Sequence, residues 1–167
     1  MSFIEMIEYS AIATWVRESP SIFGYTMVLS LHAMGLAIVA GIGTVVALRL
    51  LGHFAAIPLA PLLKLFPLMY TGFWINAVSG FVLLAANASS MLANTMFYIK
   101  LVLIAGAIAC LRLIRMRVFT SRVIAGIEVA PEGAHKLAWA SLGFWLAAII
   151  AGRLTAYPYF VEAWFGI

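Results

Sequence analysis

Three residues that could bind a ligand lie inside long apolar runs of this sequence: His32, Lys100 and Arg153. Ionisable side chains in such runs are costly and usually face a bundle interior or a wet cavity. An imidazole can ligate a metal, whereas an ammonium or a guanidinium attracts anions. The chain has no aspartate, which excludes aspartate-dependent catalysis. The three residues therefore predict a site for an anionic or metal-bearing ligand.

The apolar runs that carry these residues are long enough to be membrane spans. Of the 167 residues, 65% are hydrophobic and 10% charged, with a mean hydropathy of +1.10, whereas soluble domains are about 25% charged. A helix needs about 20 apolar residues to cross the hydrocarbon core. Four runs meet this length, at about 21–51, 61–87, 94–117 and 133–160. We expect an all-α polytopic membrane protein, a four-helix bundle forming one membrane domain over 1–167.

The starts of the first two spans carry proline. Ser19 followed by Pro20 predicts an N-cap and the first helical residue of span one. Pro67 predicts a kink in the first turns of span two.

The segment 2–17 is too polar to span. Its apolar residues recur at helical spacing, and the glutamates lie elsewhere on the helical wheel; the apolar residues are Ile4, Ile7, Ala11 and Trp15. This pattern predicts one short amphipathic helix that lies in the membrane interface.

Basic residues set the expected orientation. They concentrate in the connections after spans one and three, namely Arg49 and Lys64, then Arg112, Arg115, Arg117, Arg122 and Lys136. The positive-inside rule places these connections in the cytoplasm and both termini outside. Because this rule explains the positive charge, the net charge of +4 is no sign of nucleic-acid binding.

Depth in the bilayer groups the three polar residues. With Arg49 at the inner boundary, His32 falls about 8 Å below the outer surface. With Lys136 at the inner boundary, Arg153 falls about 6 Å below it, and Lys100 lies about one turn inside. Asn76 falls about halfway through span two.

Packing alone is one explanation for these residues. His32 could bond a backbone carbonyl or a polar group on a neighbouring helix, while Lys100 and Arg153 could extend to lipid headgroups. Their anionic partner could equally be Glu18 or Glu162, a headgroup, or an acidic ligand.

A b-type haem is the first functional reading. His32 would be an axial ligand, and the glycines Gly35 and Gly80 would let a flat macrocycle approach the helices. Lys100 and Arg153 would neutralise the propionates. The sixth ligand would be Met27, a residue of another subunit, or absent.

The other two histidines cannot complete that site in one chain. His53 and His135 lie at the opposite boundary, more than about 20 Å from His32 by helical rise. They could hold a separate haem or metal, or simply face water.

Quinone and copper are the other ligands considered. His32 and Arg153 could hydrogen-bond a quinone carbonyl, with the ring walled by Trp74, Phe81 and Trp145. Copper would suit His32 together with thioethers from Met27, Met34, Met91 and Met96. No M-x-x-M or H-x-x-x-M pattern occurs within one span. The remaining possibility is that no cofactor binds.

Four segments carry a resemblance to a known family: LSLHAMGLAIVAGIGTVVALRLLG, GFWINAVSGFVLLAANAS, NTMFYIKLVLIAGA and WLAAIIAGRLTAYPY. Over about residues 20–160 the chain resembles small bacterial four-helix membrane proteins, similar in pattern to the membrane core of copper-resistance D-type proteins. The resemblance implies a bacterial inner membrane, with both termini then in the periplasm, and a redox, haem or copper context.

These observations predict a redox-type electron-transfer or membrane-anchor protein with a polar site in the outer leaflet. The alternatives are a transport protein for copper or another small solute, and an accessory subunit of a larger membrane complex. Stripes of small residues would also allow a homo-oligomer. No nucleophile–base pair, nucleotide-binding loop or paired intramembrane carboxylate is evident, which argues against a self-contained enzyme without deciding whether the chain is one.

Overall fold

The computed structural model describes residues 2–123, 130–157, 159, 161 and 163, and every element within them is a helix. The first half contains α1 (Phe3–Glu8), α2 (Ala11–Glu18), α3 (Tyr25–Leu50), α4 (Leu59–Leu62), the 3₁₀ turn η1 (Leu63–Leu65) and α5 (Phe66–Ala86). The second half contains α6 (Ala88–Leu92), α7 (Thr95–Ile114), the π-helical segment η2 (Arg115–Val123) and α8 (Ala134–Leu154).

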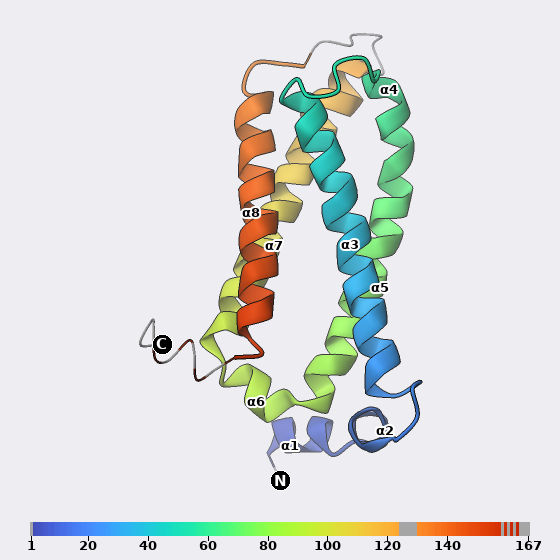
Figure 1. The fold of residues 1–167 in the computed structure, drawn as a ribbon, viewed down its shortest axis with the longest axis vertical. Coiled ribbons are helices and arrows are strands. Elements are labelled where there is room, and N and C mark those ends of the chain that lie inside the picture. Colours follow the sequence, from blue (N-terminus) through green and yellow to red (C-terminus); the bar gives the residue numbers. More distant parts are fainter. Residues whose placement is uncertain (1, 124–129, 158, 160, 162, 164–167) are drawn as a thin grey trace.

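Four of these helical stretches are long and apolar enough to cross a membrane. Within the described residues they are Tyr25–Leu50, Leu59–Ala86, Thr95–Thr120 and Ala134–Leu154. They stand side by side in one bundle (Figure 1). The all-helical fold and the four apolar helices predicted from the sequence are therefore confirmed.

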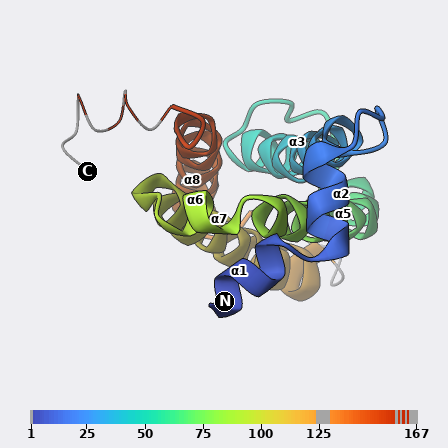
Figure 2. The ribbon, with the colours of Figure 1, turned by 90° about the horizontal axis from the view of Figure 1, so that it is seen from below.

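The two ends of the bundle differ. The short helices α1, α2 and α6 lie across one end, whereas α4 lies at the other (Figures 1 and 2). We call these the α2 end and the α4 end.

The N-terminal segment is two helices, not the single helix expected. Ser10 separates them because its hydroxyl accepts the Ala13 amide and caps α2. The residues of this segment that pack on the bundle are Ala13 and Val16, which are buried, whereas Ile4 and Trp15 of the predicted apolar face are exposed. The small residues let α2 approach α5, which leaves the large side chains outside.

Two charged side chains fasten this segment to the bundle. The Glu8 carboxylate accepts the Ser89 amide at 2.9 Å and the Ser89 hydroxyl, at the first turn of α6. Arg17 donates to the Ala86 carbonyl oxygen at 2.9 Å, at the last turn of α5. The bonds from Ser89 hold the pKa of Glu8 below its usual value. The segment therefore caps the α5–α6 junction.

The first span begins later than Ser19–Pro20 predicts. Ser19 is the C-cap of α2, and α3 starts at Tyr25 behind Gly24. The hydroxyl of Ser19 accepts the Ser21 amide, so it stabilises a turn instead of capping α3.

The break in the second span lies just before Pro67. The 3₁₀ turn η1 joins α4 to α5, and Pro67 occupies the first turn of α5. Proline is tolerated there because the first amides of a helix have no partner within it.

The last span is shorter than predicted, since α8 ends at Leu154 and not at residue 160, which lies outside the described residues. The Thr155 hydroxyl bonds the Gly152 carbonyl oxygen, and the Asn94 amide reaches the Thr155 carbonyl oxygen at 3.2 Å. These bonds satisfy carbonyl groups at the end of the helix.

The packed core occupies only the α4 half of the bundle. Its buried members reach from Val39 to Leu50 on α3, from Leu59 to Met69 on α4 and α5, from Ala107 on α7 into η2, and as far as Trp145 on α8. Helix α3 packs along α5, and α7 along α8. Towards the α2 end, beyond this cluster, the two pairs separate (Figure 1).

Candidate functional site

His32 and Asn76 form a reciprocal polar contact between α3 and α5. The Nδ1 atom of His32 lies 2.9 Å from the Asn76 backbone oxygen, and Nδ2 of Asn76 donates to the His32 backbone oxygen at 2.7 Å. The Ser79 hydroxyl lies 3.4 Å from the same Nδ1. The contact lies on the α2 side of the core.

The shorter contact of this pair favours one tautomer of the neutral imidazole. The Asn76 backbone oxygen, 2.9 Å from Nδ1, can only accept and favours a proton on Nδ1, whereas Nδ2 of Asn76, a donor, lies 3.2 Å from the same atom. With the proton on Nδ1, Nε2 is left as an acceptor. No hydrogen bond to Nε2 occurs within the described residues, and Nε2 is not among their fully buried unpaired atoms. Nε2 can therefore accept a hydrogen bond from a ligand or ligate a metal.

The glycines of the site are spacers between α3 and α5. A Cβ atom at Gly35 would lie 2.6 Å from the Asn76 amide nitrogen and 2.7 Å from the Gly72 oxygen. A Cβ atom at Gly80 would lie 2.9 Å from Cε1 of His32. The space beside Gly35 and Gly80 is thus filled by α5 and by the imidazole. A macrocycle would have to approach His32 from another side.

Lys100 reaches the site from α7. Its methylene chain passes Gly152 of α8, where an added Cβ atom would lie 3.4 Å from Cδ and Cε. The ammonium is close enough to the His32 ring for the two groups to interact electrostatically. It has no hydrogen-bond acceptor or carboxylate partner in the part of the chain that the structure describes. An ammonium in this position favours an anionic or carbonyl-bearing ligand.

Arg153 lies at the same end but points elsewhere. It is exposed, donates to the Tyr157 hydroxyl at 3.4 Å, and its guanidinium lies 5.6 Å from the centre of that ring. No contact between Arg153 and His32 occurs among the described residues.

Two other predicted site residues lie away from the imidazole. Trp74 is on α5 two positions before Asn76, on the opposite side of that helix, and lines a cleft between α5 and α7. Met27 is exposed near the start of α3. It comes five residues before His32, so the two side chains point in different directions around the helix and lie at different heights along it.

No metal site is evident in the described ranges, which contain no group of three histidine, cysteine or acidic side chains able to hold an ion. His53 follows the end of α3 and His135 lies in the first turn of α8, and both are exposed. Of the two proposed carboxylate partners, Glu18 pairs with Arg17 at 3.2 Å, and Glu162 lies outside the described residues.

Ser79 is the site residue that sequence reasoning missed. It is buried and three residues after Asn76, the spacing that puts two side chains on one helical face. Together, Asn76 and Ser79 form a polar pair in an apolar span, and that pairing is the signal that could have identified Ser79.

Comparison of the chain with family models, curated proteins and solved structures gives no match.

Proposed function

We propose that this chain is an integral protein of a bacterial inner membrane that binds a redox cofactor at His32, with haem b as the cofactor. One observation carries the proposal: Nδ1 of His32 lies 2.9 Å from the Asn76 backbone oxygen, to which it can donate, while Nε2 has no hydrogen bond within the described residues. Metal-ligating histidines nearly always donate their second ring N–H to a carbonyl, carboxylate or water, which fixes the ring and raises its basicity.

Charge near the imidazole supports an acidic cofactor. The Lys100 ammonium, which has no acceptor among the described residues, is close enough to the His32 ring to interact with it electrostatically, and exposed Arg153 is at the same end of the bundle. Either cation could neutralise a propionate group. His32 would be the one iron ligand that this chain supplies, and a bound haem would supply one-electron redox chemistry. The protein would then act in electron transfer or anchor a partner that does.

Spectroscopy tests this proposal directly. The purified protein, expressed with added haem precursor, is expected to show a Soret band and, after dithionite reduction, a sharp α band. His32→Ala should remove both bands. His53→Ala and His135→Ala are matched controls, because both histidines are exposed at the far end, and they should leave the spectrum unchanged. A colourless protein without iron would refute haem binding.

Quinone binding is the second candidate, favoured by the pairing of an acceptor with a donor. Nε2 of His32 can accept from a quinol hydroxyl, and the Lys100 ammonium can donate to a quinone carbonyl. Solvent extracts of the purified protein should then contain quinone in proportion to protein. Lys100→Gln and His32→Ala should each lower that content, and an extract without quinone would refute this candidate.

A further inference from the structure

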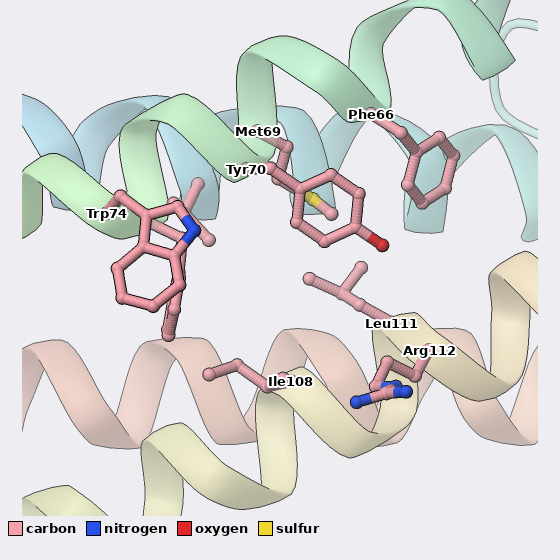
Figure 3. Close-up of a pocket in the computed structure, with 9 residues that line it drawn as sticks. Phe66, Met69, Tyr70, Trp74, Ile108, Leu111 and Arg112 are labelled. Carbon is pink, nitrogen blue, oxygen red and sulfur yellow. The ribbon is translucent and has the colours of Figure 1, made fainter. Parts of the chain in front are cut away.

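A cavity that does not include His32 in its lining opens between α5 and α7. Its volume is about 360 Å³, within the range of small-molecule sites, and Val39 of α3 belongs to its lining. The close-up shows Trp74 towards one end of this cleft, and Phe66, the Tyr70 hydroxyl and Arg112 towards the other (Figure 3).

Most of the lining is apolar or aromatic. Besides Trp74, which is 64% exposed, the walls include Phe73, Met69, Ile108 and Leu111. Leu111 and Met69 are core residues, so the floor of the cleft is the packed interior. An elongated apolar chain would bury against this floor and against the exposed indole.

The other end of the cleft is cationic. Arg112 lines it and has no acceptor within the described part of the chain. Arg115, one turn further on, donates to the Tyr70 hydroxyl and lies 5.3 Å from the centre of the Tyr70 ring and 5.6 Å from that of Phe66. These contacts hold Tyr70 in place, so Arg112 is the cleft-lining guanidinium that has no acceptor among the described residues.

We propose that this cleft binds one anionic glycerophospholipid. Its phosphate bonds Arg112 at the α4 end, and one acyl chain runs past Phe73 and Trp74. Arg112 is exposed at the mouth of the cleft, so its guanidinium is accessible to an anion, and the apolar groove beside it favours a ligand that joins an anion to a hydrocarbon tail. The basic residues of this end, Arg49, Lys64, Arg112, Arg115, Arg117 and Lys136, attract anionic headgroups.

Lipid titration of the detergent-purified chain, with bound lipid counted by native mass spectrometry, tests the assignment. Dioleoyl phosphatidylglycerol should bind more tightly than dioleoyl phosphatidylcholine, which has the same tails. Arg112→Gln should weaken phosphatidylglycerol binding about fivefold and leave phosphatidylcholine binding unchanged. Trp74→Ala should weaken both lipids, because the tail loses its wall.

Matched controls separate the cleft from general surface charge. Arg117→Gln removes the same charge from a residue that lines a different cavity, beside Glu132. Trp139→Ala removes an indole that is also 64% exposed, from α8, which contributes no residue to the lining of the cleft. Neither should change lipid binding. If Arg112→Gln impairs folding, Arg112→Lys serves instead, since it keeps the charge and should keep most of the preference for phosphatidylglycerol.

Three results would overturn the proposal. Equal losses in Arg112→Gln and Arg117→Gln would mean nonspecific attraction. Competition by inorganic phosphate at millimolar concentration would mean an anion site without a role for the tail. Displacement of the lipid by a short-chain ubiquinone, equal in wild type and Arg112→Gln, would assign the cleft to a neutral quinone.

Discussion

His32 and Asn76 bond each other twice across the α3–α5 interface, once through the imidazole and once through the side-chain amide. Nδ1 of His32 lies 2.9 Å from the Asn76 backbone oxygen, and Nδ2 of Asn76 donates to the His32 backbone oxygen at 2.7 Å. The pair couples the position of the imidazole to the packing of two helices, so changes in packing should alter the site.

Asn76→Ala should destabilise the fold by about 1 kcal/mol, because polar contacts between apolar helices are worth roughly that amount. Unfolding in mixed micelles at increasing SDS fraction measures the change. Thr71→Ala is the control, since Thr71 is exposed on the same helix and bonds only its own helix, at the Pro67 oxygen. Equal effects of the two variants would contradict a contact between helices.

Gly35→Ala should destabilise the protein by about 1–3 kcal/mol, the usual cost of overpacking. The added Cβ atom would meet backbone atoms of Asn76 and Gly72 at less than 3 Å, and backbone cannot yield without moving a helix. Gly41→Ala lies on the same helix with nothing within 4 Å. It should be neutral or stabilising, because alanine is the better helix former. SDS unfolding of both variants decides the point.

Ser141→Ala should be neutral or stabilising. The Ser141 hydroxyl is fully buried and has no hydrogen-bond partner in the described residues. The indole nitrogen of Trp145, one turn away, is also buried without a partner there. Removing an unpaired polar group removes its desolvation cost. Trp145→Ala, by contrast, should cost about 3–5 kcal/mol through the cavity it leaves. A large loss in Ser141→Ala would reveal a partner for the hydroxyl.

Acidification should release α1 and α2 from the bundle. The folded state lowers the pKa of Glu8 from its usual 4.5, mainly through the bonds from Ser89. The ionised carboxylate therefore stabilises docking above pH 4.5, and this contribution is lost as the pH falls through the lower folded-state pKa. Hydrogen–deuterium exchange of residues 3–18, corrected for intrinsic rates, should rise over that range.

Ser89→Ala provides the comparison for this titration. It removes the hydroxyl donor, so the midpoint of the exchange transition should move up towards pH 4.5. Glu18→Gln should leave the midpoint in place, because the Glu18 side chain is exposed and bonds only its neighbour Arg17 in the described structure. A midpoint unaffected by Ser89→Ala would contradict the assigned contact.

The predicted orientation places the α2 end in the periplasm. In a Cys110→Ala background, Thr95→Cys at the α2 end should react with a membrane-impermeant maleimide in intact spheroplasts. Ala55→Cys, in the connection at the α4 end, should react only after lysis. Both positions are exposed. The opposite pattern would reverse the orientation.

The sequence determined the architecture, because long apolar runs are stable in a bilayer only as helices and run length is visible directly. It also selected His32, Asn76, Gly35 and Gly80, since polar and glycine residues stand out in such runs. Helix ends were less predictable. Ser19 could cap a helix or stabilise a turn, and its neighbours in three dimensions decided for the turn.

Only the tertiary structure decided which of these residues meet. Bilayer depth predicts only how high each residue lies along its helix. It does not predict how each helix is rotated about its own axis relative to its neighbours. Rotation turns His32 towards Asn76, turns Trp74 to the other side of α5, and leaves Arg153 beside Tyr157. It also joins Trp74 and Arg112 in one cleft. The close packing of small residues such as Gly35 and Gly72 sets these rotations. They could not be predicted from the sequence because they depend on contacts between helices.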